Sequence, residues 1–160
     1  MLSGLFPALL VAALAILPLV MVDHDVGLRG SVSQQSLSAA PLAEALLVQQ
    51  QALLTWARGN PGVTGAVAQA SLSFPGPWSP PTRVASLIGN TATGPVAVTW
   101  YAGTQVPNGA MTGALVQLHG YAQDVGLVAA GVLVSPAAFF TPLPAGVPAG
   151  VPAVADLVTP

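Results

Sequence analysis

The sequence predicts an α+β protein in which a single N-terminal transmembrane helix precedes a small domain, with an amphipathic helix packed on a short antiparallel sheet. Three observations lead to this prediction. The chain opens with an uncharged apolar segment, continues with a segment carrying helix start and stop signals, and later contains a run of alternating strand-forming residues. Its 160 residues allow one compact domain plus an attachment.

The first element is the segment from Leu2 to Val22, which has 21 consecutive residues without a charged side chain. At about 1.5 Å per residue, a helix of this length spans roughly 31 Å, the thickness of the hydrocarbon core of a bilayer. Its Leu, Ile, Val and Phe residues favour insertion by on the order of 4–7 kcal/mol before Pro7 and Pro18 are counted against it. We therefore expect residues 1–22 to anchor the chain in a lipid bilayer through residues 2–22. The alternative is a cleaved signal peptide, although a basic start and an Ala-x-Ala cleavage site are both missing.

Residues 23–40 are expected to form a linker, because Val26 to Ala40 contain Gly27, Gly30 and four serines, a composition typical of a flexible link. The tripeptide Asp23-His24-Asp25 is the densest titratable cluster of the chain. We interpret it as the polar boundary of the membrane helix, since three consecutive residues do not readily all face one metal ion. The positive charge before the span is the α-amino group, and acidic residues follow the span directly, whereas Arg29 weakly favours the opposite orientation. On balance we expect the C-terminal domain on the outer side of the membrane.

The domain is expected to cover residues 41–140 and to begin with a helix. Pro41 suits a first helical turn, Glu44 complements the N-terminal dipole, and Arg58-Gly59-Asn60-Pro61 supplies a basic last turn and a stop. An apolar stripe follows the helical period, made of Leu42, Leu46, Leu53 and Trp56 or Ala57. Three consecutive glutamines, Gln49 to Gln51, are expected to cross the more polar side.

The remaining elements of the domain are shorter. Residues 66–74 alternate loosely as a strand would, and the proline-rich run 75–81 predicts a surface loop whose Trp78 closes the core. The clearest strand is Val96 to Tyr101, where Val96, Val98 and Trp100 alternate with smaller or polar residues. A short helix is predicted after Asn108-Gly109. A hairpin then joins residues 124–127 to residues 131–134, with Gly131 able to adopt positive φ.

Residues 141–160 are expected to form a disordered tail. They contain five prolines and no large aromatic residue, so they offer little apolar surface to offset the entropy of ordering.

Composition excludes several kinds of chemistry. The chain has three arginines, five acidic residues, no lysine and no cysteine, which removes P-loop phosphate binding, lysine Schiff bases, thiol catalysis and cysteine-bound metal. The arginines lie 25 or more positions apart, too widely spaced for a nucleic-acid-binding patch. His119 and Asp124 could belong to a hydrolase-like triad, but no Gly-x-Ser-x-Gly motif is present. We predict no enzyme, no metal and no cofactor, with the hydrolase-like domain as an alternative.

A type IV prepilin is a further class to consider, because prepilins also begin with a hydrophobic helix. Their leader ends in Gly and is followed by Glu at the fifth position of the helix. Here Gly4 is followed by Leu5, and the fifth position is Leu9. Processing into a pilin is therefore not expected.

The succession of short motifs resembles the small PilM family associated with thin type IV pili of conjugative systems, a family unrelated to the larger actin-like protein of the same name. The resemblance covers about residues 1–136. The residues that carry it are Trp56-x-x-x-Asn60-Pro61, Thr64-Gly65-x-Val67, Leu72-x-Phe74-Pro75, Val98-x-Trp100-Tyr101, Val125-Gly126 and Gly131-x-Leu133-x-Ser135-Pro136.

The resemblance implies a single-pass protein of the bacterial inner membrane with a periplasmic domain. Such a protein would be a non-enzymatic component of the pilus biogenesis or pilin-export apparatus, with other pilus-assembly proteins as partners and self-association left open. The candidate interface residues are Trp56, Trp78, Trp100 and Tyr101, because aromatic side chains dominate protein–protein contacts, although core packing is expected for at least half of them. A minor-pilin-like subunit and a secreted domain released by signal cleavage are the alternatives.

Overall fold

The computed structural model describes residues 39–76, 78–120, 123–137 and 139–159. The predicted anchor and most of the predicted linker, residues 1–38, lie outside the described residues. Within these ranges, no helix combines the length and the apolar character that crossing a membrane requires.

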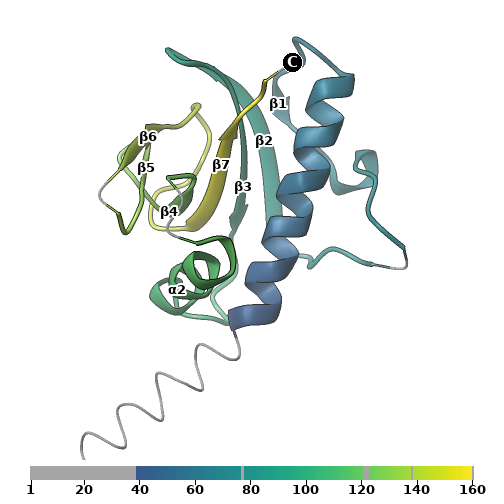
Figure 1. Cartoon of the computed structure of the whole chain (residues 1–160). Coiled ribbons are helices and arrows are strands. Elements are labelled where there is room, and N and C mark those ends of the chain that lie inside the picture. Colours follow the sequence, from purple (N-terminus) through teal and green to yellow (C-terminus); the bar gives the residue numbers. More distant parts are fainter. Residues whose placement is uncertain (1–38, 77, 121–122, 138, 160) are drawn as a thin grey trace, which may run out of the picture. The chain divides into compact units, whose positions relative to one another are not determined.

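The described residues form a small α+β domain with one antiparallel sheet (Figure 1). A long helix covers residues 39–59. It is followed by β1 (Gly65–Ala66), a 3-10 turn (Gln69–Ser71), β2 (Val84–Thr91), β3 (Gly94–Tyr101), α2 (Asn108–His119), β4 (Val125–Ala129), β5 (Val132–Val134), β6 (Phe140–Pro142) and β7 (Pro152–Leu157). The strand order β1-β2-β3-β7-β4-β5-β6, with every neighbouring pair antiparallel, confirms the predicted class of the domain.

Strand β3 separates two halves of the core, because residues on both of its faces are buried. Ala97 and Tyr101 face the long helix and pack with it. Val98 and Trp100 face the opposite side, where Leu133 of β5 belongs to the same apolar cluster. Alternation along one strand thus places successive side chains in different clusters, and the sheet carries the long helix and α2 on one face (Figure 1).

The backbones of β4 and β5 lie so close together that one position requires a glycine. A Cβ at Gly126 would lie 2.2 Å from the carbonyl oxygen of Val134, far inside van der Waals contact. At the turn itself Gly131 has φ 78°, which confirms the predicted hairpin and its positive-φ glycine.

The prediction of a disordered tail is wrong. Residues 152–157 form β7, which lies between β3 and β4 and pairs with both. Ala153, Val154 and Ala155 are all buried. The segment is ordered despite its sparse apolar surface, because its small side chains are covered on both faces of the sheet and its backbone is hydrogen-bonded to a strand on each side.

The glutamines of the long helix also differ from the prediction. Gln49 and Gln50 are 0% and 3% exposed, and only Gln51 is exposed. The Gln49 Nε2 atom donates to Ser86 Oγ of β2 at 2.9 Å, and Gln69 Nε2 donates to Gln49 Oε1 at 3.1 Å. These hydrogen bonds compensate the cost of burying the amide.

Candidate functional site

The four aromatic residues expected at an interface fall into two groups. Trp100 is 8% exposed and Tyr101 is 1% exposed, each inside a hydrophobic cluster, so neither is available to a partner in this fold. Trp56 and Trp78 are half-buried. The expectation that at least half would pack in the core is therefore confirmed, and Trp56 and Trp78 remain the candidates for partner contact.

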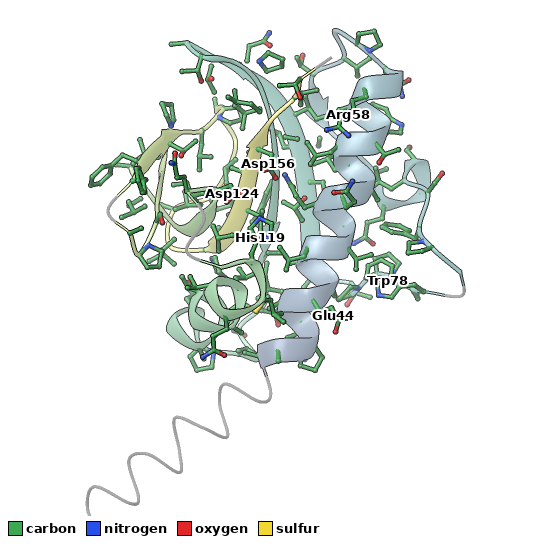
Figure 2. The ribbon with its side chains drawn as sticks, in the orientation of Figure 1. Glu44, Arg58, Trp78, His119, Asp124 and Asp156 are labelled. Atoms are coloured by element: carbon green, nitrogen blue, oxygen red, sulfur yellow. The ribbon has the colours of Figure 1, made fainter. Side chains whose placement is uncertain are left out.

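Trp78 belongs to an aromatic pair that rests against the long helix. Its ring lies 4.7 Å from the ring of Phe74, centroid to centroid, at an interplanar angle of 47°. Phe74 in turn packs on the cluster that contains Leu53 and Ala57 of the helix, as does Trp56. Figure 2 shows Trp78 on the loop that runs past the helix. The proline-rich loop therefore covers part of the core, as the sequence predicts.

A groove lies between this loop and the solvent-facing side of the long helix. It has a volume of about 480 Å³ and is lined by Val48, Gln51, Ala52, Thr55, Ser73, Phe74 and Pro75. Four of these residues are apolar, and the other three are polar without a charge. The lining residues on the helix are Val48, Gln51, Ala52 and Thr55. Residues three or four positions apart are neighbours on one face of a helix, so these four present a continuous surface to a partner. We take this groove, together with Trp78, whose ring contacts the lining residue Phe74, as the candidate functional site.

The sequence does not predict the groove, although it singles out Trp78, whose ring contacts the groove residue Phe74. The helix period marks Val48 and Thr55 as lying off the buried stripe, but only the folded loop brings Phe74 and Pro75 opposite them. No local signal in residues 73–75 specifies that contact.

A second exposed apolar region lies on the short strands. Leu127 of β4 pairs with Val134 of β5, which pairs with Phe140 of β6, so the three residues form one row across the sheet. Phe140 is 67% exposed and Phe139 beside it is 44% exposed. Pro142 has no N–H to offer to another strand, which limits pairing along this edge.

His119 and Asp124, the pair that a hydrolase-like site would need, are in contact. The His119 Nε2 atom lies 2.9 Å from Asp124 Oδ2. Ser86 is engaged elsewhere, since its hydroxyl bonds to Gln49 and Thr99 in the core.

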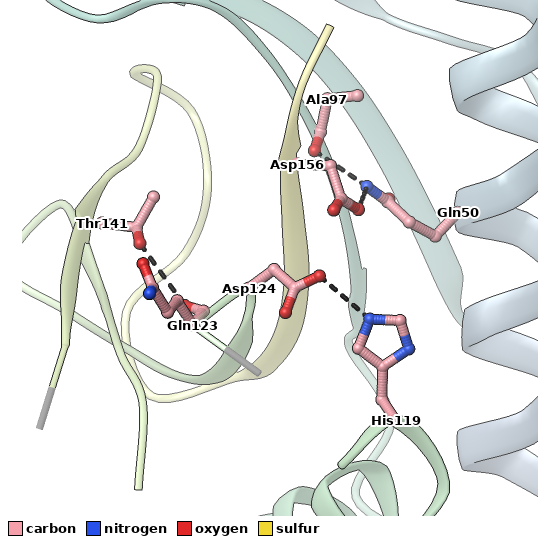
Figure 3. Close-up of polar contacts among 7 residues, drawn as sticks. All are labelled: Gln50, Ala97, His119, Gln123, Asp124, Thr141 and Asp156. Atoms are coloured by element: carbon pink, nitrogen blue, oxygen red, sulfur yellow. Dashed lines mark hydrogen bonds and ion pairs between the residues drawn. The ribbon is translucent and has the colours of Figure 1, made fainter. Parts of the chain in front are cut away.

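The same two residues belong to a larger polar cluster (Figure 3). Gln50 Nε2 donates to Asp156 Oδ2 at 2.8 Å and to the Ala97 carbonyl at 3.0 Å. Burial raises the pKa of Asp156 to about 6, and the charge of the nearby Asp124 contributes to the increase. No group of three or more His, Asp or Glu side chains able to hold a metal ion is found among the residues that the structure describes.

Comparison with protein families matches residues 15–155 to the PilM family. Similar solved structures include a PilM protein from Escherichia coli B7A, with 20% sequence identity and a TM-score of 0.53, covering 77% of this chain and 94% of that one. Another is a PilM protein from Pseudomonas aeruginosa 2192, with 29% identity and a TM-score of 0.39, covering 74% of this chain and 94% of that one. The first of these shares the fold described above. No match is found among curated proteins.

Proposed function

Since this chain belongs to the PilM family, we propose that it is a non-enzymatic inner-membrane component of a type IV pilus biogenesis or pilin-export apparatus, acting through protein–protein contacts. The single observation that carries the proposal is the family match over residues 15–155, which spans most of the chain. The family is pilus-related.

The location rests on the uncharged segment from Leu2 to Val22, which is long enough for a single membrane span. We propose that this segment holds the protein in the inner membrane and that the domain of residues 39–160 lies in the periplasm. Anchoring confines the domain to the plane where pilus-assembly proteins meet, so weak individual contacts would suffice at a high local concentration.

The contacts rest on the groove between the long helix and the proline-rich loop. We propose that a segment of another pilus-assembly protein packs there, against Phe74 and the exposed side of the helix. The half-buried Trp78, whose ring contacts Phe74, would extend this surface. The uncharged lining favours an apolar partner segment, because a charged one would lose its hydration without gaining a counter-charge.

Membrane fractionation with intact-mass measurement tests the location. The full chain should remain in the membrane fraction at its uncleaved mass, and protease added to spheroplasts should digest its C-terminal domain. A soluble product that begins after Val22 would show that the segment is a signal peptide. Recovery in sheared pili, and not in the membrane, would instead support the minor-pilin-like alternative.

Site-specific photo-crosslinking tests the groove in cells that assemble the pilus. A photoreactive residue at Gln51, which is exposed and lines the groove, should give a crosslink to another pilus-assembly protein. The matched control is Thr93, which is exposed at the turn between β2 and β3 and lies outside the groove. Equal crosslinking at both positions, or none at Gln51, would contradict the proposed contact.

A further inference from the structure

A second concave surface lies at the C-terminal end of the long helix. It is a pocket of about 390 Å³ between the last turn of that helix, the turn that follows it and the neighbouring parts of β2 and β3. Its walls include the apolar side chains of Ala57, Ile88 and Val158. A largely apolar pocket of this size, with a few polar groups, is typical of a ligand-binding site.

Three polar side chains line this pocket and have no hydrogen-bond or ion-pair partner among the described residues. They are Arg58 from the last turn of the helix, Thr64 from the segment before β1, and Asn90 from β2, and all three are exposed. Figure 2 shows Arg58 at the end of the long helix. The pocket therefore combines an apolar wall with a positive charge and with two neutral groups that are free to bind a ligand.

The backbone of Asn90 offers a further contact at the same place. Strand β1 pairs with only two residues of β2 and reaches no further than Ile88. On this side of β2 the Ser86 carbonyl accepts from the Val67 N–H, and backbone groups alternate between the two sides of a strand. Asn90, two residues beyond Ile88, therefore presents its N–H and C=O on the side of β1, where no described residue pairs with them.

We propose that this pocket binds the apolar C-terminal end of another polypeptide. The α-carboxylate of the ligand pairs with Arg58, its last side chain enters the apolar pocket, and its backbone bonds to the free edge of β2 at Asn90. A chain end suits this site because its negative charge lies on the same residue as an apolar side chain. An internal acidic residue uses its own side chain to carry the charge and leaves the pocket unfilled.

The surroundings of Arg58 favour a negatively charged ligand. Carbonyl groups at the C-terminus of a helix carry a partial negative charge that would repel a carboxylate. Here the carbonyls of Trp56 and Ala57 are already hydrogen-bonded, to the side-chain amide and the backbone N–H of Asn60 respectively. No acidic residue lines the pocket. Arg58 is therefore the full charge that a ligand meets there.

Methyl NMR of the full chain in detergent tests the proposal, because isoleucine occurs only twice in the sequence. Ile88 lines the pocket and Ile16 lies in the predicted anchor, so isoleucine-methyl labelling gives two signals, which Ile16→Leu assigns. The probes are peptides acetyl-Gly-Ser-Gly-Ser-Val-X with a free carboxylate, where X is Ala, Val, Leu or Phe. At least one of these acids should shift the Ile88 signal in a saturable manner and leave the Ile16 signal unchanged.

The contribution of the charge is measured with amidated peptides and with arginine variants. The C-terminal amide of the same peptide should bind about tenfold more weakly than the acid or weaker still, because it lacks the charge that pairs with Arg58. Arg58→Gln should reduce the affinity for the acid to that for the amide and leave the affinity for the amide unchanged. The matched control is Arg83→Gln, since Arg83 is exposed but does not line the pocket, and it should bind the acid as the wild-type chain does.

Equal affinities for acid and amide, or an affinity for the acid that Arg58→Gln does not change, would overturn the inference. So would the absence of an Ile88 shift with every peptide at millimolar concentration. Parallel shifts of Ile16 and Ile88 would overturn it as well, because they would report partition of the peptide into the detergent. The pocket and the groove share no lining residue, so the crosslinking experiment at Gln51 tests the proposed function separately.

Discussion

Replacement of Val154 by Ala tests whether the C-terminal residues form the middle of the sheet. Val154 lies on β7, is fully buried, and packs in the cluster that contains Leu46 and Leu115. The substitution removes two methyl groups, worth about 0.8 kcal/mol each in transfer free energy, and leaves a cavity flanked by paired strands that cannot easily collapse. We expect a loss of about 2–3 kcal/mol in the free energy of unfolding.

The matched control is Leu157→Ala in the same strand. Leu157 is 50% exposed, so this variant removes more carbon than Val154→Ala but should change the free energy of unfolding by less than about 0.5 kcal/mol. Both variants are measured by urea unfolding of the full chain, followed by tryptophan fluorescence and circular dichroism. A change in the free energy of unfolding of less than about 0.5 kcal/mol for Val154→Ala, the usual range for surface substitutions, would show that β7 is not the buried strand described above. A larger loss for Leu157→Ala than for Val154→Ala would show the same.

Three further changes test other parts of the fold by thermal unfolding. Gly126→Ala places a Cβ 2.2 Å from the Val134 carbonyl oxygen, so it should destabilise the domain by about 3 kcal/mol or more unless the hairpin moves; a neutral result would show that β4 and β5 are not this close. Gly113→Ala lies inside α2 with nothing within 4 Å of the new Cβ, and should stabilise the domain by about 0.5–1 kcal/mol through helix propensity. Gln49→Ala removes the hydrogen bond to Ser86 and opens a cavity, for an expected loss of about 2–3 kcal/mol, whereas a surface glutamine would show almost none.

The elements that sequence analysis predicts correctly are those whose signals are local. Val96, Val98 and Trp100 alternate with their neighbours in β3, and Asn108-Gly109 marks the start of α2. Gly131 marks the turn of the β4–β5 hairpin. Each of these patterns is complete within a few residues, so no distant partner is needed to recognise it.

The elements that escape prediction depend on distant partners. Strand β2 was not predicted, because Ser86, Gly89 and Asn90 interrupt its apolar pattern, yet it pairs with β3 along its full length. Strand β7 begins with a proline and consists mainly of small residues, and only its position between β3 and β4 gives it a stable place. The predicted alternation over residues 66–74 is mostly replaced by a two-residue strand and a 3-10 turn.

In the candidate site, too, the residue types are evident from the sequence, whereas their exposure and neighbours depend on distant contacts. The sequence singles out the large aromatic residues, but their exposure depends on which face of a strand or helix each one occupies. Trp100 and Tyr101 are buried because both faces of β3 are covered. The groove near Trp78 exists because residues 73–75 return to the long helix, and the polar cluster of Asp156 exists because β7 enters the sheet beside β4.

The most direct test of the central claim is a count of surface pili in a bacterial host that carries this gene, with the gene intact, deleted, or restored in trans. The account predicts that deletion abolishes or sharply reduces pilus number and that the full chain restores it. Restoration should fail for a chain that lacks the Leu2 to Val22 segment, provided that the truncated protein is still made. Unchanged pilus number after deletion would contradict a role in pilus biogenesis.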